Sequence, residues 1–404
     1  MAAPPGRYVF DPFAEGFIED PYPHYARLRT LDPAQEHPLG FWVLSTYEGV
    51  SKLLSSGHSV DESRLLNVPL SKDPSTLGKQ ARPLQGLSVL DQDPPDHPRL
   101  RRLMAKALAP RSVDALSSRI QELVDALCDR IAELGHADLV AELAFPLPFA
   151  VVSEMLGAPP VDQARLRDLS GILLRTLEPL PDPLLREQVR SANEELMAIG
   201  RDMVERKRAA PADDLLTALI TAEHEGDLHG ESELVAQVMF LYLAGHETTV
   251  NLISNGLLAL LRNPDQLRLF SRRPDIAANA VDELLRYDSP AQLARRVTTE
   301  AFAVHGKEIP AGSFVTACLS AANRDPEFWG PDADTLRLDR PSAHRHLSFG
   351  GGAHSCLGAR LARLEGRIAL SRLVKHFPSL SLDRVSWNGR INLRGPDELW
   401  IDAA

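Results

Sequence analysis

The chain has 404 residues, of which 44% are hydrophobic and 25% charged, which is the composition of a globular protein. Its net charge of -11 argues against binding to nucleic acid or to an anionic membrane surface. The sequence does not start like a signal peptide, and its longest apolar run, 234–245, is shorter than the roughly 18 residues that a membrane span needs. We therefore expect a cytoplasmic protein without membrane contact.

Helical periodicity dominates the chain from residue 98 onward. Apolar residues recur every three or four positions and predict helices over 98–109, 112–134, 139–156, 187–208, 213–223, 231–262, 264–271, 275–287 and 356–376. Short strand-like segments lie near 40–50, 295–320 and 380–402. We expect one domain over residues 1–404, mainly α: a large helical body (about 98–290 and 356–376) with a long central helix and a small mixed β-sheet region.

The predicted helix 231–262 carries residues that disfavour a helix interior at its middle. It would be about 48 Å long at 1.5 Å per residue, and "AGHETT" (244–249) stands at its centre. Such a break of local rules is typical of functional sites, and threonine hydroxyls can bond the carbonyl four residues back. Gly245 fits a contact between packed helices equally well, so the sequence is compatible with both a functional and a packing role for this stretch.

Cys356 has unusual surroundings, "FGGGAHSCLG" (349–358), at the entry to the helix 356–376. Cys128 and Cys318 lie in apolar stretches and are expected in the core. Three cysteines without a CxxC pair exclude a disulfide framework and a common zinc ribbon. An inert thiol, a nucleophile and a metal thiolate are all compatible with the cysteine loop. A lone thiolate at a helix N-terminus suits the axial position of haem iron.

Four motifs in one order and spacing resemble the cytochrome P450 family. "FGGGAHSCLG" is similar to its haem-binding loop, and "AGHETT" to the oxygen-activation segment of its long helix. "ELLR" (283–286) is similar to its Glu-x-x-Arg helix, and "DPPDHPRLRRLMAKALAP" (93–110) to the segment that reaches a haem propionate. The chain thus resembles a soluble, bacterial-type cytochrome P450 over nearly its whole length.

The resemblance implies haem b as the cofactor, with the Cys356 thiolate bound to its iron. Phe349 would pack beside the sulfur, and cationic side chains would bind the two propionates, because buried carboxylates need such partners. Each of these charges alone also fits a solvated surface. The implied cofactor-binding residues are His97, Arg101, Ala244, Gly245, Arg296, Phe349, Gly350, His354, Cys356 and Gly358.

Glu283 and Arg286 stand three residues apart and therefore share a helix face. The spacing alone predicts a surface ion pair of small energy, about 0–1 kcal/mol. The resemblance implies instead a buried network with Arg340 that supports the cysteine loop. These three residues are expected to be structural.

Glu247 and Thr248 are the catalytic candidates by resemblance. A hydroxyl can hold an ordered water and a carboxylate behind it can relay protons from solvent. The implied function is a haem-thiolate monooxygenase that uses O2 to hydroxylate or epoxidise a medium-sized, largely apolar substrate of polyketide, terpenoid, steroid or fatty-acid type. Desaturation, oxidative coupling and a non-catalytic haem sensor are the alternatives. A zinc site from His344, His346, His354 and Cys356 is the alternative metal site.

Electrons would come from a separate ferredoxin and reductase, because the chain has no dinucleotide-binding glycine fingerprint. We expect a monomer that presents a basic docking patch to an acidic ferredoxin, although the same residues fit a solvated helix face. The patch would comprise Arg99, Arg102, Lys106, Arg360, Arg363 and Arg367. The substrate pocket implied by resemblance comprises Leu87, Val89, Phe240, Leu243, Gln292, Leu293 and Leu393, besides parts of 65–90 and 170–185. The role of His246 stays open between the substrate and a neighbouring helix.

Overall fold

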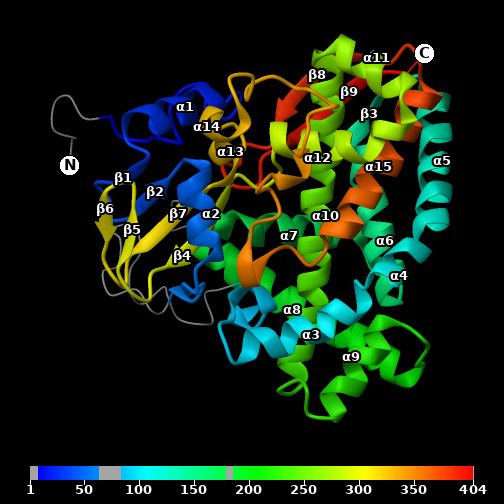
Figure 1. Ribbon diagram of the computed structural model, residues 1–404. Helices are drawn as coiled ribbons and strands as arrows, with labels where there is room; N and C mark the ends of the chain where they lie inside the picture. The colour runs from blue at the N-terminus through cyan, green and yellow to red at the C-terminus, as the bar shows by residue number, and fades with distance from the viewer. Residues whose placement is uncertain (1–7, 63–82, 179–184, 404) are drawn as a thin grey trace.

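The computed structural model describes residues 8–62, 83–178 and 185–403, and helices make up most of it (Figure 1). The helical body begins with α3 (Asp96–Ala107), α4 (Pro110–Ala115), α5 (Ser117–Leu134), α6 (Pro146–Leu156) and α7 (Gln163–Leu174). They are followed by α8 (Leu185–Ala209), α9 (Leu215–His224), α10 (Glu231–Arg262), α11 (Pro264–Arg272), α12 (Ala277–Tyr287) and α15 (Ala359–His376). Four helices lie outside this body: α1 (Tyr22–Leu31), α2 (Tyr47–Ser55), α13 (Leu319–Ala322) and α14 (Pro326–Trp329).

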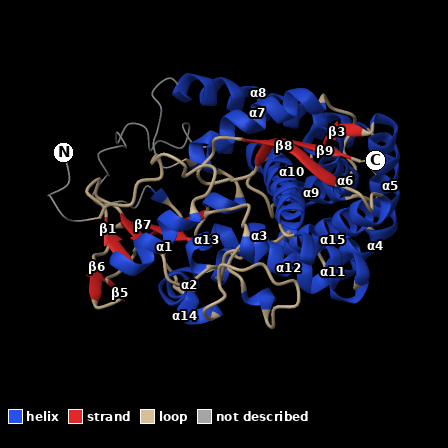
Figure 2. Ribbon diagram, turned by 90° about the horizontal axis from the view of Figure 1, so that it is seen from above, coloured by secondary structure: helices blue, strands red, loops and turns tan. Residues whose placement is uncertain are grey.

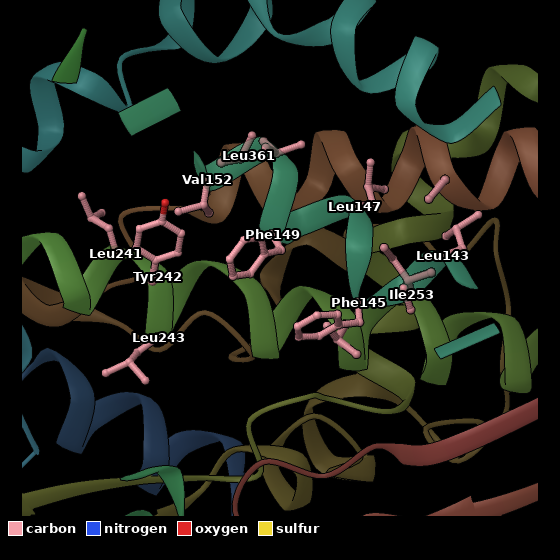
Figure 3. Close-up of a cluster of buried hydrophobic side chains, with 14 of the residues drawn as sticks. Leu143, Phe145, Leu147, Phe149, Val152, Leu241, Tyr242, Leu243, Ile253 and Leu361 are labelled. Carbon is pink, nitrogen blue, oxygen red and sulfur yellow. The ribbon is translucent and has the colours of Figure 1, made fainter. Parts of the chain in front are cut away.

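The long central helix is present with the predicted bounds, residues 231–262. Buried residues occur on every side of α10, as expected for a helix surrounded by protein. In Figure 2 the helix is seen nearly end-on among the other helices. Its apolar side chains meet those of α6 and α15, as Figure 3 shows for Phe149, Tyr242 and Leu361.

The strands form three small sheets in the described part of the chain. A four-stranded mixed sheet has the order β1-β2-β7-β4, with β2 parallel to β7 and the other pairs antiparallel. A three-stranded antiparallel sheet has the order β3-β9-β8, and β5 pairs with β6 in a hairpin. The bounds are β1 (Ala34–Glu36), β2 (Trp42–Leu44), β3 (His136–Asp138), β4 (Leu293–Val297), β5 (Phe302–Val304), β6 (Lys307–Ile309), β7 (Phe314–Cys318), β8 (Ser381–Trp387) and β9 (Pro396–Asp402). The mainly α architecture with a small mixed sheet is confirmed.

Several helices differ from the sequence-based prediction. The helix expected over 112–134 is divided at Leu116, and that over 139–156 begins as a π-helical turn before α6 starts at Pro146. Helices α1, α2 and α7 were not predicted. Both α2 and α7 have an N-cap signal in the sequence, because Thr46 accepts the Gly49 N–H and Asp162 accepts the Arg165 N–H.

The two expected core cysteines, Cys128 and Cys318, are fully buried. None of the helices in the described ranges is long and apolar enough to span a membrane. Parts of the predicted substrate pocket in 65–90 and 170–185 lie outside the described residues.

Candidate active site

The loop before α15 presents Cys356 in a fixed conformation. The Cys356 N–H donates to the Phe349 carbonyl at 2.8 Å, and the Gly358 N–H donates to the cysteine sulfur. Gly352 has a φ of 65°, and a Cβ there would lie 2.2 Å from the carbonyl oxygen of Leu54 on α2. At this position, therefore, the close approach of α2 requires the glycine.

The side chain of Cys356 is exposed by surface area, yet enough protein surrounds the sulfur that burial raises the pKa of its thiol. The Gly358 N–H and then Arg101 and Arg363 act in the opposite direction. The sequence predicted a thiolate stabilised at a helix N-terminus, but α15 begins only at Ala359, three residues later. A metal ion bound to the sulfur would supply the missing positive charge, because a coordinating thiol is deprotonated.

Four cationic or donor side chains predicted to bind the cofactor gather beside this loop. The rings of His97 and His354 lie 4.0 Å apart, and Arg101 Nη2 donates to the Ser355 carbonyl at 2.8 Å. Burial lowers the pKa of Arg296 and of both histidines, that of His354 to about 4. Among the described residues no ion pair joins Arg101 or Arg296 to a carboxylate, although the charge of Asp93 acts on Arg296. A buried arginine beside a half-buried one fits the two propionates of a haem.

The predicted network around Glu283 is buried and complete. Arg286 donates to both carboxylate oxygens of Glu283 at 2.7 and 2.8 Å, and Arg340 Nε donates to Oε1 at 3.1 Å. Arg286 also binds the carbonyl of Asn323, whose side chain donates to Ser348 at 2.9 Å. The network therefore reaches the residue that precedes the cysteine loop, in agreement with a structural role.

The alternative zinc site lacks a common centre. His346 Nε2 instead lies 3.2 Å from Asp282 Oδ1, and Arg363 binds the same oxygen at 2.7 Å. The Arg363 guanidinium also stacks 4.6 Å from the centre of the Phe349 ring. Within the described ranges, no group of three His, Cys, Asp or Glu side chains could hold a metal ion.

The middle of α10 is regular in its backbone but unusual in its exposure. Ala244 is exposed although its neighbour Leu243 is buried. Thr248 Oγ1 donates to the Ala244 carbonyl at 3.1 Å, the hydrogen bond expected from the sequence. A Cβ on Gly245 would lie 2.6 Å from Val152 Cγ2 on α6, so the helix-packing interpretation of this glycine is confirmed.

Glu247 is held by residues that its own motif does not contain. Arg390, in the turn after β8, donates to Glu247 Oε1. The Glu247 side chain is only 15% exposed, and its other oxygen, Oε2, lies 3.7 Å from His246 Nε2. Sequence reasoning missed Arg390, because 143 residues separate it from Glu247 and no local pattern links them.

Arg390 also lines a cavity of about 590 Å³, whose other lining residues include part of the predicted pocket segment 170–185. Arg167 and Arg175 line the same cavity, together with Asp168 and Glu178. Glu178 accepts hydrogen bonds from the N–H groups of Ile391 and Asn392 at 2.8 and 3.2 Å, which fixes the Arg390 turn. Glu247 is thus linked through one arginine to a charged cavity.

Two predicted pocket residues are tied to the central helix. Gln237 on α10 donates to the Leu87 carbonyl at 2.7 Å and accepts the Val89 N–H at 3.1 Å. The structure thus brings this segment to the helix that also carries Phe240 and Leu243. Both of these are apolar and at least partly buried.

Gln292, predicted to line the pocket, uses its side-chain amide to bind other parts of the chain. Its side chain is fully buried, donates to the Ser289 carbonyl at 2.6 Å and accepts from the Tyr25 hydroxyl at 3.2 Å. Both amide atoms therefore serve the fold. The neighbouring predicted residues Leu293 and Leu393 come together, because the N–H of Leu293 and that of Gln292 both donate to Asn392.

The predicted basic docking patch is smaller than expected. Three of its arginines neutralise carboxylates of the chain itself, so their charge is not free: Arg99 binds Asp96 and Glu233, Arg360 binds Asp114, and Arg363 binds Asp282. Arg102, Lys106 and Arg367 are exposed. The available positive charge is therefore restricted to these three side chains.

Comparison with known proteins agrees with this geometry. The family model for cytochrome P450 matches residues 171–268 and 275–386. Cytochrome P450 107B1 of Saccharopolyspora erythraea is 37% identical over 398 residues, which cover 96% of each chain. Vitamin D(3) 25-hydroxylase of Pseudonocardia autotrophica is 38% identical over 389 residues, which cover 93% of this chain and 91% of that protein.

A solved structure has the same fold. The crystal structure of P450BioI in complex with an acyl carrier protein ligated to hexadec-9Z-enoic acid has a TM-score of 0.88 and 32% identity, covering 96% of this chain and 100% of that one. The chain belongs to the cytochrome P450 family. It is an oxidoreductase of the monooxygenase class, which incorporates one oxygen atom of O2 into a small molecule, and the family binds haem through a cysteine thiolate.

Proposed function

We propose that this chain hydroxylates or epoxidises a medium-sized, largely apolar molecule, with haem b bound through Cys356. The observation that carries the proposal is the cysteine loop. It presents an exposed residue whose sulfur accepts the Gly358 N–H, beside Arg101 and the buried Arg296. When bound, the haem would supply the activation of O2 with electrons from outside the chain. Every other task falls to side chains of this protein.

Four side chains would anchor the cofactor through its propionates: His97, Arg101, Arg296 and His354. Because Arg296 is 7% exposed, an anionic partner there would remove the cost of a buried charge. Phe349 would pack beside the sulfur, held on its other side by the Arg363 guanidinium. Ala244 and Gly350 would lie against the macrocycle.

Glu247 and Thr248 would deliver protons. The Thr248 hydroxyl, which donates to the Ala244 carbonyl, keeps its lone pairs for an ordered water. Glu247 stands between this helix and the charged cavity of Arg390, so it can exchange protons with solvent water there. Without directed protons, the reducing equivalents would be lost as hydrogen peroxide.

The proposed substrate is apolar because the predicted pocket residues other than Gln292 are aliphatic or aromatic: Leu87, Val89, Phe240, Leu243, Leu293 and Leu393. The relatives named above support this class. One is named a vitamin D(3) 25-hydroxylase and another was solved with a fatty acyl chain on its carrier protein. A polyketide, terpenoid, steroid or fatty-acid derivative would fit the same chemistry.

We further propose a cytoplasmic monomer that receives electrons from an acidic ferredoxin. The net charge of -11 would repel such a partner from most of the surface. Arg102 and Lys106 on α3 and Arg367 on α15 are exposed and would provide the attractive contact.

The absorption spectrum of the reduced protein with carbon monoxide tests the proposal. We expect a Soret band strongly shifted to the red, because the Cys356 thiolate would bind the haem iron. Cys356→Ser should abolish this shift, and Cys128→Ala, a control in the buried core, should retain it. A haem band without the red shift in the unmodified protein would contradict thiolate ligation and favour a sensor. A protein that binds no haem would contradict the whole proposal.

A further inference from the structure

His246 lies inside an aromatic pocket rather than beside a substrate. Its side chain is 1% exposed, and its ring centre is 5.7 Å from that of Phe145 and 6.2 Å from that of Phe149. Figure 3 shows both phenylalanines against α10. Within this pocket each ring nitrogen faces one polar group: Nδ1 faces the Tyr242 carbonyl on the same helix, and Nε2 faces the Glu247 carboxyl group.

The first of these directions fixes the tautomer. His246 Nδ1 contacts the Tyr242 carbonyl oxygen, which can only accept, so Nδ1 carries the hydrogen. Burial lowers the pKa of this imidazole more than any neighbouring charge changes it. The ring is therefore neutral, and Nε2 holds a lone pair. Among the residues that the structure describes, Nε2 has no hydrogen-bond partner.

The second direction places this lone pair opposite a carboxyl oxygen. His246 Nε2 is 3.7 Å from Glu247 Oε2, and Arg390 occupies Oε1 from the other side. A lone pair and a carboxylate oxygen repel each other unless a proton lies between them. A small rotation of the Glu247 side chain would shorten this separation to hydrogen-bond length.

We propose that His246 is a positioning residue for Glu247: its Nε2 accepts a hydrogen bond from the protonated carboxyl while Arg390 fixes the opposite oxygen. The inference rests on the proposed role of Glu247 in proton delivery. The proton stays on the carboxyl while this hydrogen bond holds Oε2 in place, so no bond breaks and no other reactant is needed.

The surrounding charges act on the His246 imidazole in both directions, and burial has the larger effect. Glu247 on α10 stabilises the imidazolium, whereas Arg167 on α7 and Arg390 in the turn after β8 oppose it. Phe145 and Phe149, on the side of α6, bring no charge to the ring. The imidazole therefore stays neutral, and its Nε2 lone pair remains available as a hydrogen-bond acceptor.

Two substitutions separate the two ring nitrogens. His246→Asn retains an N–H in the place of Nδ1 but has nothing in the place of Nε2, whereas His246→Gln puts an amide near Nε2. The readout is the share of NADH oxidation that ends as hydrogen peroxide, measured against pH with a surrogate ferredoxin and reductase. We expect His246→Asn to raise this share severalfold and to shift its pH midpoint, and His246→Gln to restore both substantially. Equal behaviour of the two variants and the unmodified protein would overturn the proposal.

Nitrogen NMR of histidine-labelled, reduced, carbon monoxide-bound protein tests the pair without turnover. The resonances lost in His246→Asn identify the residue, and we expect a neutral ring protonated at Nδ1. Glu247→Gln should move the Nε2 resonance, whereas Glu231→Gln, at the start of the same helix, should not. An Nε2–H tautomer, or an Nε2 resonance indifferent to Glu247→Gln, would contradict the inference. If the NMR result holds but Glu247→Gln leaves peroxide formation unchanged, the proposed role of Glu247 fails instead.

Discussion

Glu365 on α15 is a buried acid that the proposed chemistry does not use. It is 1% exposed, its Oε2 has no hydrogen-bond partner among the described residues, and burial raises its pKa from 4.5 to about 8. At a pH between 4.5 and about 8, Glu365 is protonated in the folded chain and ionised in the unfolded chain. The protonated carboxyl therefore makes its full contribution to the free energy of unfolding below pH 4.5. This contribution is lost as the pH rises through about 8.

We expect Glu365→Gln to remove this pH dependence, because the amide does not titrate. Each pKa unit corresponds to about 1.4 kcal/mol, so the unmodified protein should lose on the order of a few kcal/mol relative to the variant between about pH 5 and about pH 8. Urea unfolding at several pH values measures the difference. Glu133→Gln, at an exposed site on α5, is the matched control and should leave the slope unchanged. Parallel pH profiles for Glu365→Gln and the unmodified protein would show that the carboxyl is already ionised in the fold.

The close contact between helices α10 and α6 depends on a glycine, Gly245. Gly245 lets Val152 approach the backbone of α10, since a Cβ would lie 2.6 Å from its Cγ2. Glycine usually costs a helix about 1 kcal/mol relative to alanine. The close packing of the two helices, which also encloses His246, offsets that cost.

Gly245→Ala should therefore destabilise the protein, although the same change in an open helix would stabilise it. Overpacking predicts a loss of about 1–3 kcal/mol in the free energy of unfolding. In a Val152→Ala background the added methyl has room, so the loss should disappear. Unfolding of the single and double variants gives the coupling energy between the two sites. If the changes in the free energy of unfolding for the two substitutions simply add, the helices separate without strain and the prediction is wrong.

The whole molecule is acidic, and few cations of the predicted docking patch are free of ion pairs. The chain carries a net charge of -11, and three predicted docking arginines are already paired with its own carboxylates. The exposed Arg102 and Lys106 on α3 retain their positive charge at the surface. Long-range steering of an acidic partner would therefore depend on few residues.

Lys106→Glu should raise the KM for an acidic ferredoxin severalfold and weaken its dependence on salt, because the attraction that salt screens is removed. Steady-state NADH oxidation at two ionic strengths measures both effects. Lys375→Glu, an exposed site near the end of α15, makes the same charge change and should have little effect. If the two variants change the KM equally, net charge rather than a docking site on α3 governs the reaction.

Features that depend on neighbouring residues could be predicted from the sequence. The bounds of α10 follow from its continuous apolar periodicity and the Asn263-Pro264 stop, and Thr248 binds the carbonyl four residues back as expected. The cysteine loop and the Glu283 helix were found through short motifs. Even the missed helices α2 and α7 carry local N-cap signals at Thr46 and Asp162.

Contacts between residues far apart in the sequence could not be predicted and became visible in the folded chain. Arg390 reaches Glu247 across 143 residues, and Gln292 is taken into the fold by Tyr25. Ion pairs with acids on other elements removed Arg360 and Arg363 from the predicted docking patch. A local sequence pattern indicates only which residues lie near each other within one helix or strand. Partners from different elements are selected by packing and by the cost of leaving a buried charge unpaired, which depend on the whole chain.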